Sequence, residues 1–280
     1  MSSVVRTGII RGGIEIRQSL TNALDLWTYL FPAVVLLATV FFMGDAQVPG
    51  TDFSLGASTV PSVLGVNIAF AGLITVASLL VVDREDGTLL RAKAVPGGMT
   101  GYLTGKVVLV GGMTLISLLL QLLPSLLIVD GVSLDAAGWL TLLWLLPLGL
   151  LATMPLGAVF GSLFENPRSI GLITLPMFGL VAISGIFYPI TALPGWVQGI
   201  AQVFPVYWLG LGTRSAFLPD ELSAVELGDS WRHLETFGVL GLWAVVGLAV
   251  APFILRRMAR RESGSAVAAR REKAMTRAAM

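Results

Sequence analysis

Long apolar runs separated by short polar segments constrain this chain more than any other feature of its sequence. Hydrophobic residues make up 55% of its 280 residues and charged residues only 12%. In soluble domains about a quarter of all residues are charged. A helix needs roughly 20 apolar residues to cross a bilayer. The sequence therefore predicts an all-α integral membrane protein with one domain and no sizeable soluble part.

We expect about six transmembrane helices. The apolar runs that define them cover residues 24–43, 60–82, 105–129, 139–164, 169–187 and 237–255. The first run is longer than the core of a signal peptide, which is about 7–15 residues. It also lacks a small-residue cleavage site, so we expect it to remain in the mature protein.

The first 22 residues are too charged to span a membrane. Arg6, Arg11 and Arg17 alternate there with aliphatic residues, a pattern typical of a helix that lies in the membrane interface. Three glycines weaken any such helix, so a disordered leader is the alternative.

Lysine and arginine are unevenly distributed between the two sides of the predicted bundle. With the N-terminus inside, sixteen of the eighteen lie on the cytoplasmic side, and only Arg214 and Arg232 lie outside. Because loops rich in Lys and Arg stay in the cytoplasm, we expect both termini to be cytoplasmic. The net charge of only +1 argues against a nucleic-acid partner.

The loop between the second and third apolar runs is densely charged. From Asp83 to Pro96 it begins with acidic residues and Thr88 and ends with Arg91 and Lys93. Acidic and hydroxyl residues favour the start of a helix, and basic residues favour its end. We predict a short capped helix that serves as a docking handle. A solvated turn is the alternative.

The segment after the fifth run combines prolines with aromatic residues. Pro189 and Pro194 should interrupt helices, and Trp196, Tyr207 and Trp208 favour a membrane interface. We predict a re-entrant or interface-lying helical hairpin on the outer side. An ordinary outer loop with an aromatic belt is the alternative.

Together and in this order, these segments resemble the ABC-2 permeases, the membrane subunits of type V bacterial ABC exporters that include drug and antibiotic resistance exporters. The resemblance covers nearly the whole chain. It depends on Glu85-Asp86-Gly87-Thr88 after the second run and on Gly185-Ile186-Phe187-Tyr188-Pro189 after the fifth. The permease domain it implies has an interfacial helix in 1–22, a coupling-helix loop in 83–101, an outer hairpin and loop in 188–232 and a basic cytoplasmic tail in 256–280.

The resemblance also implies partners in a bacterial plasma membrane. Two copies of a separate cytoplasmic ABC ATPase would bind the coupling helix and the N-terminal interfacial helix. A second permease, identical or not, would complete the transporter. This chain would then be no enzyme and bind no cofactor, since ATP and magnesium belong to the ATPase. The implied ATPase-coupling residues are Asp83, Arg84, Glu85, Asp86, Gly87, Thr88 and Arg91, and those of the outer hairpin or gate are Gly185, Phe187, Tyr188, Pro189, Pro194 and Trp196.

Several side chains within the apolar runs suit a path for cargo. The candidates are Phe31, Phe41, Phe70, Asn67, Met177 and Phe178. Their apolar and aromatic character favours a lipophilic drug, antibiotic or lipid. Lipid contact or core packing is the alternative for each of them, and an interhelical hydrogen bond is the simpler use of Asn67 and of Gln121.

Small residues recur at helical spacing in two places. Gly97, Gly101 and Gly105 lead into the third run, and Gly157 and Gly161 lie in the fourth. Such spacing lets helix backbones approach closely in a membrane, so we expect tight helix packing there.

Three other classes of protein compete with the exporter. An ion-coupled secondary transporter or channel needs ionisable residues inside the membrane, and the apolar runs hold almost none. An intramembrane enzyme is disfavoured because the chain has no cysteine and its sole histidine, His233, belongs to no zinc-binding pattern. A non-transporting assembly factor stays open.

Overall fold

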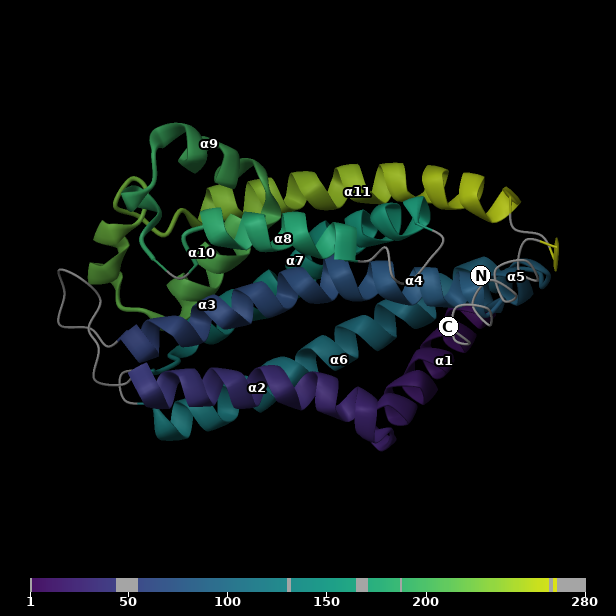
Figure 1. Cartoon of the computed structure of the whole chain (residues 1–280), viewed down its shortest axis with the longest axis horizontal. Helices are drawn as coiled ribbons and strands as arrows, with labels where there is room; N and C mark the ends of the chain where they lie inside the picture. Colours follow the sequence, from purple (N-terminus) through teal and green to yellow (C-terminus); the bar gives the residue numbers. More distant parts are fainter. Residues whose placement is uncertain are drawn as a thin grey trace, which may run out of the picture.

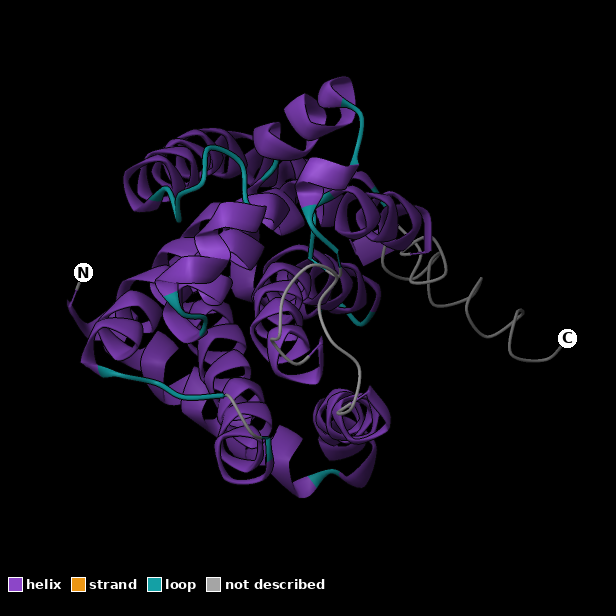
Figure 2. Cartoon of the chain, turned by 90° about the vertical axis from the view of Figure 1, so that its left-hand side faces the viewer, coloured by secondary structure: helices purple, strands orange, loops and turns teal. Residues whose placement is uncertain are grey.

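The chain folds into an all-helical bundle. The computed structural model describes residues 2–43, 55–129, 132–164, 171–186, 188–261 and 264–265, and these contain helices and no strand (Figure 2). A bilayer offers no water to bond with exposed N–H and C=O groups, and a helix pairs these groups within itself. The prediction of an all-α fold is confirmed.

The helices follow one another with few residues between them. They are α1 (Ser2–Thr21), α2 (Ala23–Met43), α3 (Leu55–Phe70), the π-helix η1 (Ala71–Thr75), α4 (Val76–Glu85), α5 (Thr88–Lys93), α6 (Gly98–Ile128), α7 (Ala136–Leu163), α8 (Gly171–Ile183), the 3-10 helix η3 (Ile190–Ala192), α9 (Gly195–Val203), α10 (Pro205–Phe217), the 3-10 helix η4 (Asp220–Val225) and α11 (His233–Arg261).

Four of the described helical segments are long and apolar enough to cross a membrane. They are Ala57–Glu85, Gly98–Ile128, Ala136–Leu163 and His233–Arg260. In the places expected of the first and fifth spans lie α2, of 21 residues, and α8, of only 13. The multi-pass membrane protein is confirmed, and the count of six spans stays a prediction.

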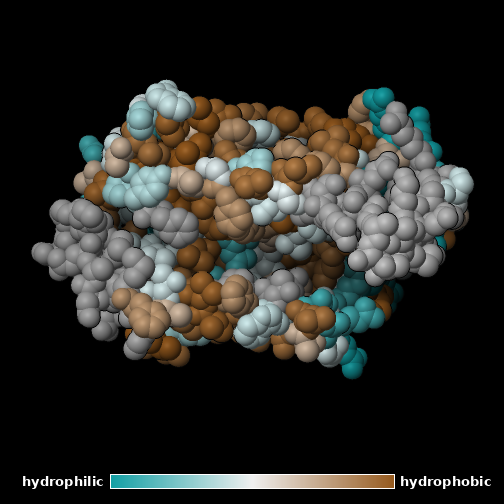
Figure 3. Space-filling model, in the orientation of Figure 1, coloured by the Kyte–Doolittle hydropathy of each residue, from teal (hydrophilic) through white to brown (hydrophobic). Residues whose placement is uncertain are grey.

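The bundle has two distinct ends (Figure 1). α1, α5 and the last turns of α11 lie at the right of the view, which we call the α5 end, and α9 and α10 lie at the left, which we call the α9 end. Hydrophobic residues cover most of the middle of the face in Figure 3, and hydrophilic ones gather toward the ends. This is the surface expected of a protein that crosses a bilayer.

Helix α10 forms the centre of the largest core. It packs on α3, α7 and α11, and Tyr207, Leu209 and Leu211 are fully buried. The extended residue Phe204 separates α10 from α9, and Pro205 starts α10 where its missing N–H costs no helical hydrogen bond. The predicted hairpin is present as these two helices, and its re-entrant course stays a prediction.

Close helix packing occurs at both predicted glycine ladders. A Cβ added at Gly157 would lie 2.2 Å from the carbonyl oxygen of Gly72 in η1. In the other ladder the partner is the N-terminal helix, because a Cβ added at Gly8 would lie 2.7 Å from the carbonyl oxygen of Gly101. Both expectations of tight packing are confirmed, and α1 runs parallel to the start of α6.

Candidate functional site

The charged segment from Asp83 to Pro96 divides into the end of one helix and a short second helix. Asp83, Arg84 and Glu85 complete α4, and α5 begins only at Thr88. Gly87 separates the two with φ +77°, a left-handed conformation that glycine adopts without steric cost. The prediction of one helix over the whole segment is therefore wrong. Gly87 is the N-cap of α5 and has no side chain to cap it, and the Asp86 carboxylate, one residue earlier, accepts a hydrogen bond from the N–H of Thr88 at 2.7 Å.

Asp83 points into the protein and joins a line of alternating charges that we call the charge chain: Arg11, Glu15, Lys106 and Asp83. The Lys106 ammonium lies 2.9 Å from Asp83 Oδ2 and 3.0 Å from Glu15 Oε2, and Arg11 Nε lies 2.8 Å from Glu15 Oε1. The hydroxyl of Tyr102 also donates to Asp83 at 2.8 Å. The charge chain thereby links α1, α6 and α4 with no net charge.

Glu15 shows how strongly this environment favours the ionised carboxylate. Burial alone raises the pKa of the Glu15 carboxyl, but the hydrogen bond from Arg11 and the ammonium of Lys106 outweigh it. The pKa of Glu15 therefore lies below its ordinary value of 4.5. The Glu15 carboxylate is therefore ionised at neutral pH.

Arg84 is also buried, and it caps a transmembrane helix. Its Nη1 donates to the carbonyl oxygens of Phe164 at 2.8 Å and Ser162 at 3.2 Å, at the end of α7. The last carbonyls of a helix have no partner within it and carry partial negative charge, so a cation there is stabilising. Neither Arg84 nor Asp83 is presented to a partner on the surface.

The surface that α5 does present is one wall of a cavity of about 550 Å³, which we call the α5 groove. Thr88, Arg91, Val95 and Pro96 line it on one side. The first half of α1 and the start of α6 line the other side. The inner face of α5 packs in a small core with the last turns of α11, so the groove is attached to α1, α4, α6 and α11 at once.

Four of the six candidate cargo residues line a second cavity, of about 470 Å³, which we call the central cavity. They are Phe31, Asn67, Phe70 and Phe178, and the rings of Phe70 and Phe178 meet edge to face with centroids 5.5 Å apart. Met177 is buried in the core instead. The side chain of Phe41 lies outside the described part of the structure.

A polar network crosses one wall of the central cavity. The Asn67 amide donates to the hydroxyl of Ser117 on α6 at 3.0 Å, and Gln121 donates to the same hydroxyl at 3.0 Å. The interhelical hydrogen bond expected of Asn67 is present, whereas Gln121 bonds within its own helix. Sequence reasoning missed Ser117, which gives no signal by itself, and the π-helix η1, two of whose residues line the cavity.

The predicted gate residues gather at the α9 end. Gly185 has φ +66° beside Ile190, the Tyr188 hydroxyl donates to the carbonyl oxygen of Ala182, and Pro189 and Pro194 precede η3 and α9. Trp196 is 72% exposed, as expected of an interfacial ring. Phe187 lies outside the described residues.

The α9 end also holds a buried ion pair that sequence reasoning did not find. Arg214 Nε lies 2.6 Å from Glu226 Oε1, and both side chains are almost fully buried. Arg232 Nη1 donates to Gln202 at 2.8 Å, and its guanidinium lies 4.8 Å from the ring centroid of Trp208. The sequence did contain one signal, since Arg214 and Arg232 are the only two basic residues that the charge count assigns to the outer side.

No described group of three or more His, Cys, Asp or Glu side chains is placed to hold a metal ion. A family model for the ABC-2 family transporter proteins matches residues 49–252 of the chain. The match spans α3 to most of α11 and includes α5 and the α9 end, whereas the walls that α1 gives to the α5 groove and α2 gives to the central cavity precede it. No curated protein matches the chain.

Proposed function

Because this chain belongs to the ABC-2 family of transporter proteins, and is therefore a membrane permease of an ABC transporter, we propose that it couples ATP hydrolysis by a separate cytoplasmic ATPase to the export of a lipophilic compound. The observation that carries the proposal is the α5 groove. It is the one described cavity whose walls join the predicted coupling helix to the N-terminal helix.

The α5 groove suits a protein partner in shape and charge. Arg91 and Lys93 are exposed, Val95 is 60% exposed, and Pro96 follows at the rim. Arg91 is held in place, since it donates to the Thr88 hydroxyl at 2.8 Å and to the carbonyl oxygen of Asp86 at 3.2 Å. We propose that the ATPase docks here, holds the ATP and magnesium, and performs the catalysis that this chain does not.

The charge chain is the proposed route from the α5 groove to the membrane helices. A displacement of α5 or α1 would be transmitted to α4 and α6 through Asp83, Lys106 and Glu15. These side chains are mostly buried and form ion pairs with one another. Removing one partner of a buried ion pair destabilises a protein by roughly 3–5 kcal/mol. Movement that keeps these bonds is therefore favoured over movement that breaks them.

The central cavity is the proposed cargo site. Its volume of about 470 Å³ lies within the range of roughly 300–1,000 Å³ that drug-sized ligands occupy. Aromatic rings and aliphatic side chains make most of its walls, and Asn67 offers an amide to orient a polar group. These features favour an amphipathic drug, antibiotic or lipid over a sugar.

The remaining parts of the proposal concern the assembly. We propose that two permeases, identical or not, pair with two ATPase subunits in a bacterial plasma membrane, with the α5 end and both termini in the cytoplasm. The charge distribution supports this orientation, since the α5 end carries the exposed Arg6, Arg17 and Arg91.

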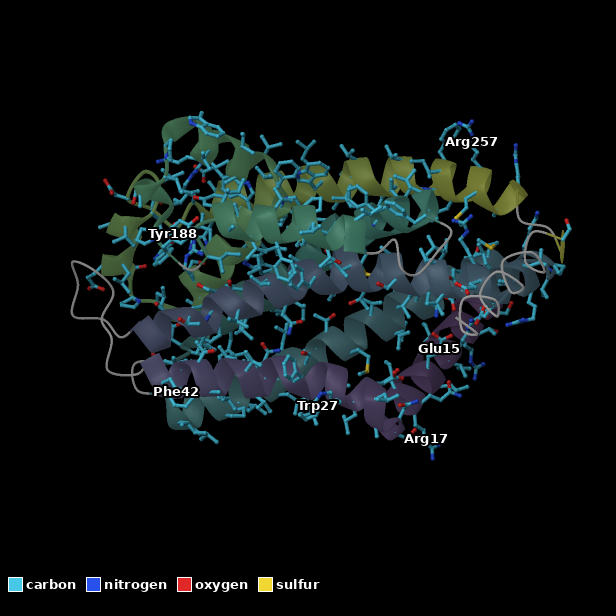
Figure 4. The ribbon with its side chains drawn as sticks, viewed as in Figure 1. Glu15, Arg17, Trp27, Phe42, Tyr188 and Arg257 are labelled. Atoms are coloured by element: carbon cyan, nitrogen blue, oxygen red, sulfur yellow. The ribbon has the colours of Figure 1, made fainter. Side chains whose placement is uncertain are left out.

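The test is to reconstitute the full chain with its ATPase in lipid vesicles and measure ATP turnover and cargo movement. Arg91→Glu should reduce stimulation of the ATPase at least tenfold, because it reverses a charge on the α5 groove. Arg17→Glu is the matched control, since Arg17, labelled in Figure 4, is exposed on α1 and does not line the groove. Cargo movement without nucleotide, driven by an ion gradient, would establish a secondary transporter instead.

A further inference from the structure

A third cavity, at the α9 end, has charged side chains in its lining, which the central cavity lacks. Its volume is about 240 Å³, and we call it the α9-end cavity. Ser58, Thr59 and Ser62 of α3 line one side, and Arg214 and Glu226 line another. A water molecule occupies about 30 Å³ of liquid volume, so the cavity has room for a group of several non-hydrogen atoms.

The Arg214–Glu226 pair has unused hydrogen-bonding capacity. Only Arg214 Nε and Glu226 Oε1 meet, and the two side chains are 6% and 5% exposed. Arg214 Nη1 and Nη2 and Glu226 Oε2 are buried, and none has a hydrogen-bond partner within the described residues. Buried polar atoms are nearly always paired in folded proteins. Three such atoms on one ion pair therefore indicate a partner that the described residues do not supply.

The unused atoms differ in the chemistry that they require. The two Nη atoms are donors only, arranged in the planar fork that fits phosphate or carboxylate oxygens. Glu226 Oε2 is an acceptor and requires an N–H or O–H donor. The pair as a whole has no net charge, so a ligand with one positive and one negative group matches it better than a simple anion does.

We propose that the α9-end cavity binds the head group of a phospholipid that joins a phosphate to a primary amine, as phosphatidylethanolamine does. The phosphate oxygens accept from the Arg214 fork, and the ammonium donates to Glu226. On the α3 side the cavity is lined by Ser58, Thr59 and Ser62, whose hydroxyl groups can also bond to a head group. A phosphocholine head group offers no N–H donor, and a phosphoglycerol head group carries no cation.

The position of the cavity is that of a lipid head group. Tyr188, which lines it, is partly exposed at the α9 end, far from Glu15 and Arg17 at the other end of the bundle (Figure 4). The exposed Trp196 belongs to the same end. Binding there requires neither the ATPase nor any cargo, so its failure leaves the proposed function unaffected.

The experiment measures lipid binding to the purified full chain by native mass spectrometry and by the shift in melting temperature. The probes are phosphatidylethanolamine, phosphatidylcholine and phosphatidylglycerol with the same acyl chains, together with glycerophosphoethanolamine and inorganic phosphate. We expect phosphatidylethanolamine to bind at least tenfold more tightly than either other lipid. Equal binding of the three lipids by the wild-type chain overturns the proposal.

Three variants assign the site. Arg214→Gln should remove most of the preference for phosphatidylethanolamine. Glu226→Gln should lower the affinity for phosphatidylethanolamine to that for phosphatidylcholine. Ser62→Leu reduces the volume of the cavity while Arg214 and Glu226 keep their identity, and it should weaken binding of phosphatidylethanolamine even if the other two variants fold poorly. Arg17→Gln is the control and should bind as the wild type does.

Two outcomes separate the possible sources of the ligand. Saturation by glycerophosphoethanolamine with the same dependence on Arg214 and Glu226 supports the head-group chemistry. Saturation by inorganic phosphate as tight as that by phosphatidylethanolamine shows an anion site and contradicts the lipid proposal. A preference that survives in Arg214→Gln, Glu226→Gln and Ser62→Leu contradicts it as well.

Discussion

The two ends of the bundle bury charge in different ways. At the α5 end, four charged side chains alternate in sign and are joined by three ion pairs between 2.8 and 3.0 Å long, and Tyr102 supplies a further hydrogen bond. At the α9 end, one ion pair of 2.6 Å leaves three of its polar atoms without a partner. The charge chain is therefore paired within itself, whereas the Arg214–Glu226 pair offers bonding capacity to something else. Outside the charge chain, Glu85 Oε2 at the end of α4 is also buried without a hydrogen-bond partner among the described residues.

The strongest test of this difference removes the central cation of the charge chain. Lys106→Met should destabilise the protein by about 3 kcal/mol, because Asp83 and Glu15 are left without their shared partner in a mostly buried place. The measurement is thermal unfolding of the purified chain in detergent. Lys93→Met, on the exposed face of α5, is the control and should stay within about 0.5 kcal/mol of the wild type.

A smaller effect comes from the contact between α1 and α6. Gly12→Ala should destabilise the protein by about 1–3 kcal/mol, because the added Cβ would lie 2.6 Å from Cβ of Val108. Gly13→Ala is the matched control on the next residue, where nothing lies within 4 Å. It should stabilise the helix by up to about 1 kcal/mol. Equal melting temperatures of the two variants would show that α1 does not pack on α6.

The charge chain should also respond to acid. Because the folded-state pKa of Glu15 lies below its unfolded value of 4.5, its ionisation contributes stability that is present above pH 4.5. That contribution is lost as the pH falls through the lowered pKa. We expect Glu15→Gln to lower the free energy of unfolding by under about 1 kcal/mol at pH 7. The variant and the wild type should be equally stable at a pH at which Glu15 of the wild type is protonated. A cost of Glu15→Gln that is independent of pH from 3 to 7 would contradict this.

The smallest effect is expected at the α9 end. Replacing Arg214 and Glu226 together by Met and Leu should change stability in lipid-free detergent by less than about 1 kcal/mol, since an isolated buried ion pair is often no more stabilising than apolar residues of similar size. The same double replacement of Lys106 and Asp83 should cost more, because it also removes partners of Glu15 and Tyr102. Similar costs at the two ends would remove the contrast between them.

Most of the fold follows from properties that a sequence displays directly. Apolar runs, glycine ladders and the prolines before η3 and α9 predicted the helical bundle, its tight contacts and its hairpin. The turn that precedes α5 is also local, because the Asp86 carboxylate bonds to the N–H of Thr88 two residues further on. These features depend on neighbours in the chain, so sequence spacing is enough to identify them.

The features that sequence reasoning missed depend on contacts between distant segments. Asp83 and Arg84 belong to a charged loop by sequence, but they turn inward because Lys106, 23 positions further on, and the end of α7 offer them partners. The π-helix at Ala71–Thr75 is likewise set by packing, since Gly72 lies against Thr153 of α7. No local pattern specifies such pairings, and only the packed helices reveal them.

The central claim is that the α5 groove faces the cytoplasm and receives the ATPase. The natural chain has no cysteine, so single cysteines at Val95 and at Trp196 can each be labelled in intact cells with a maleimide that cannot cross the membrane. We expect Trp196→Cys to be labelled and Val95→Cys to be protected. In inside-out vesicles Val95→Cys should be labelled, and added ATPase should slow that labelling. Labelling of Val95→Cys from outside intact cells would contradict the claim.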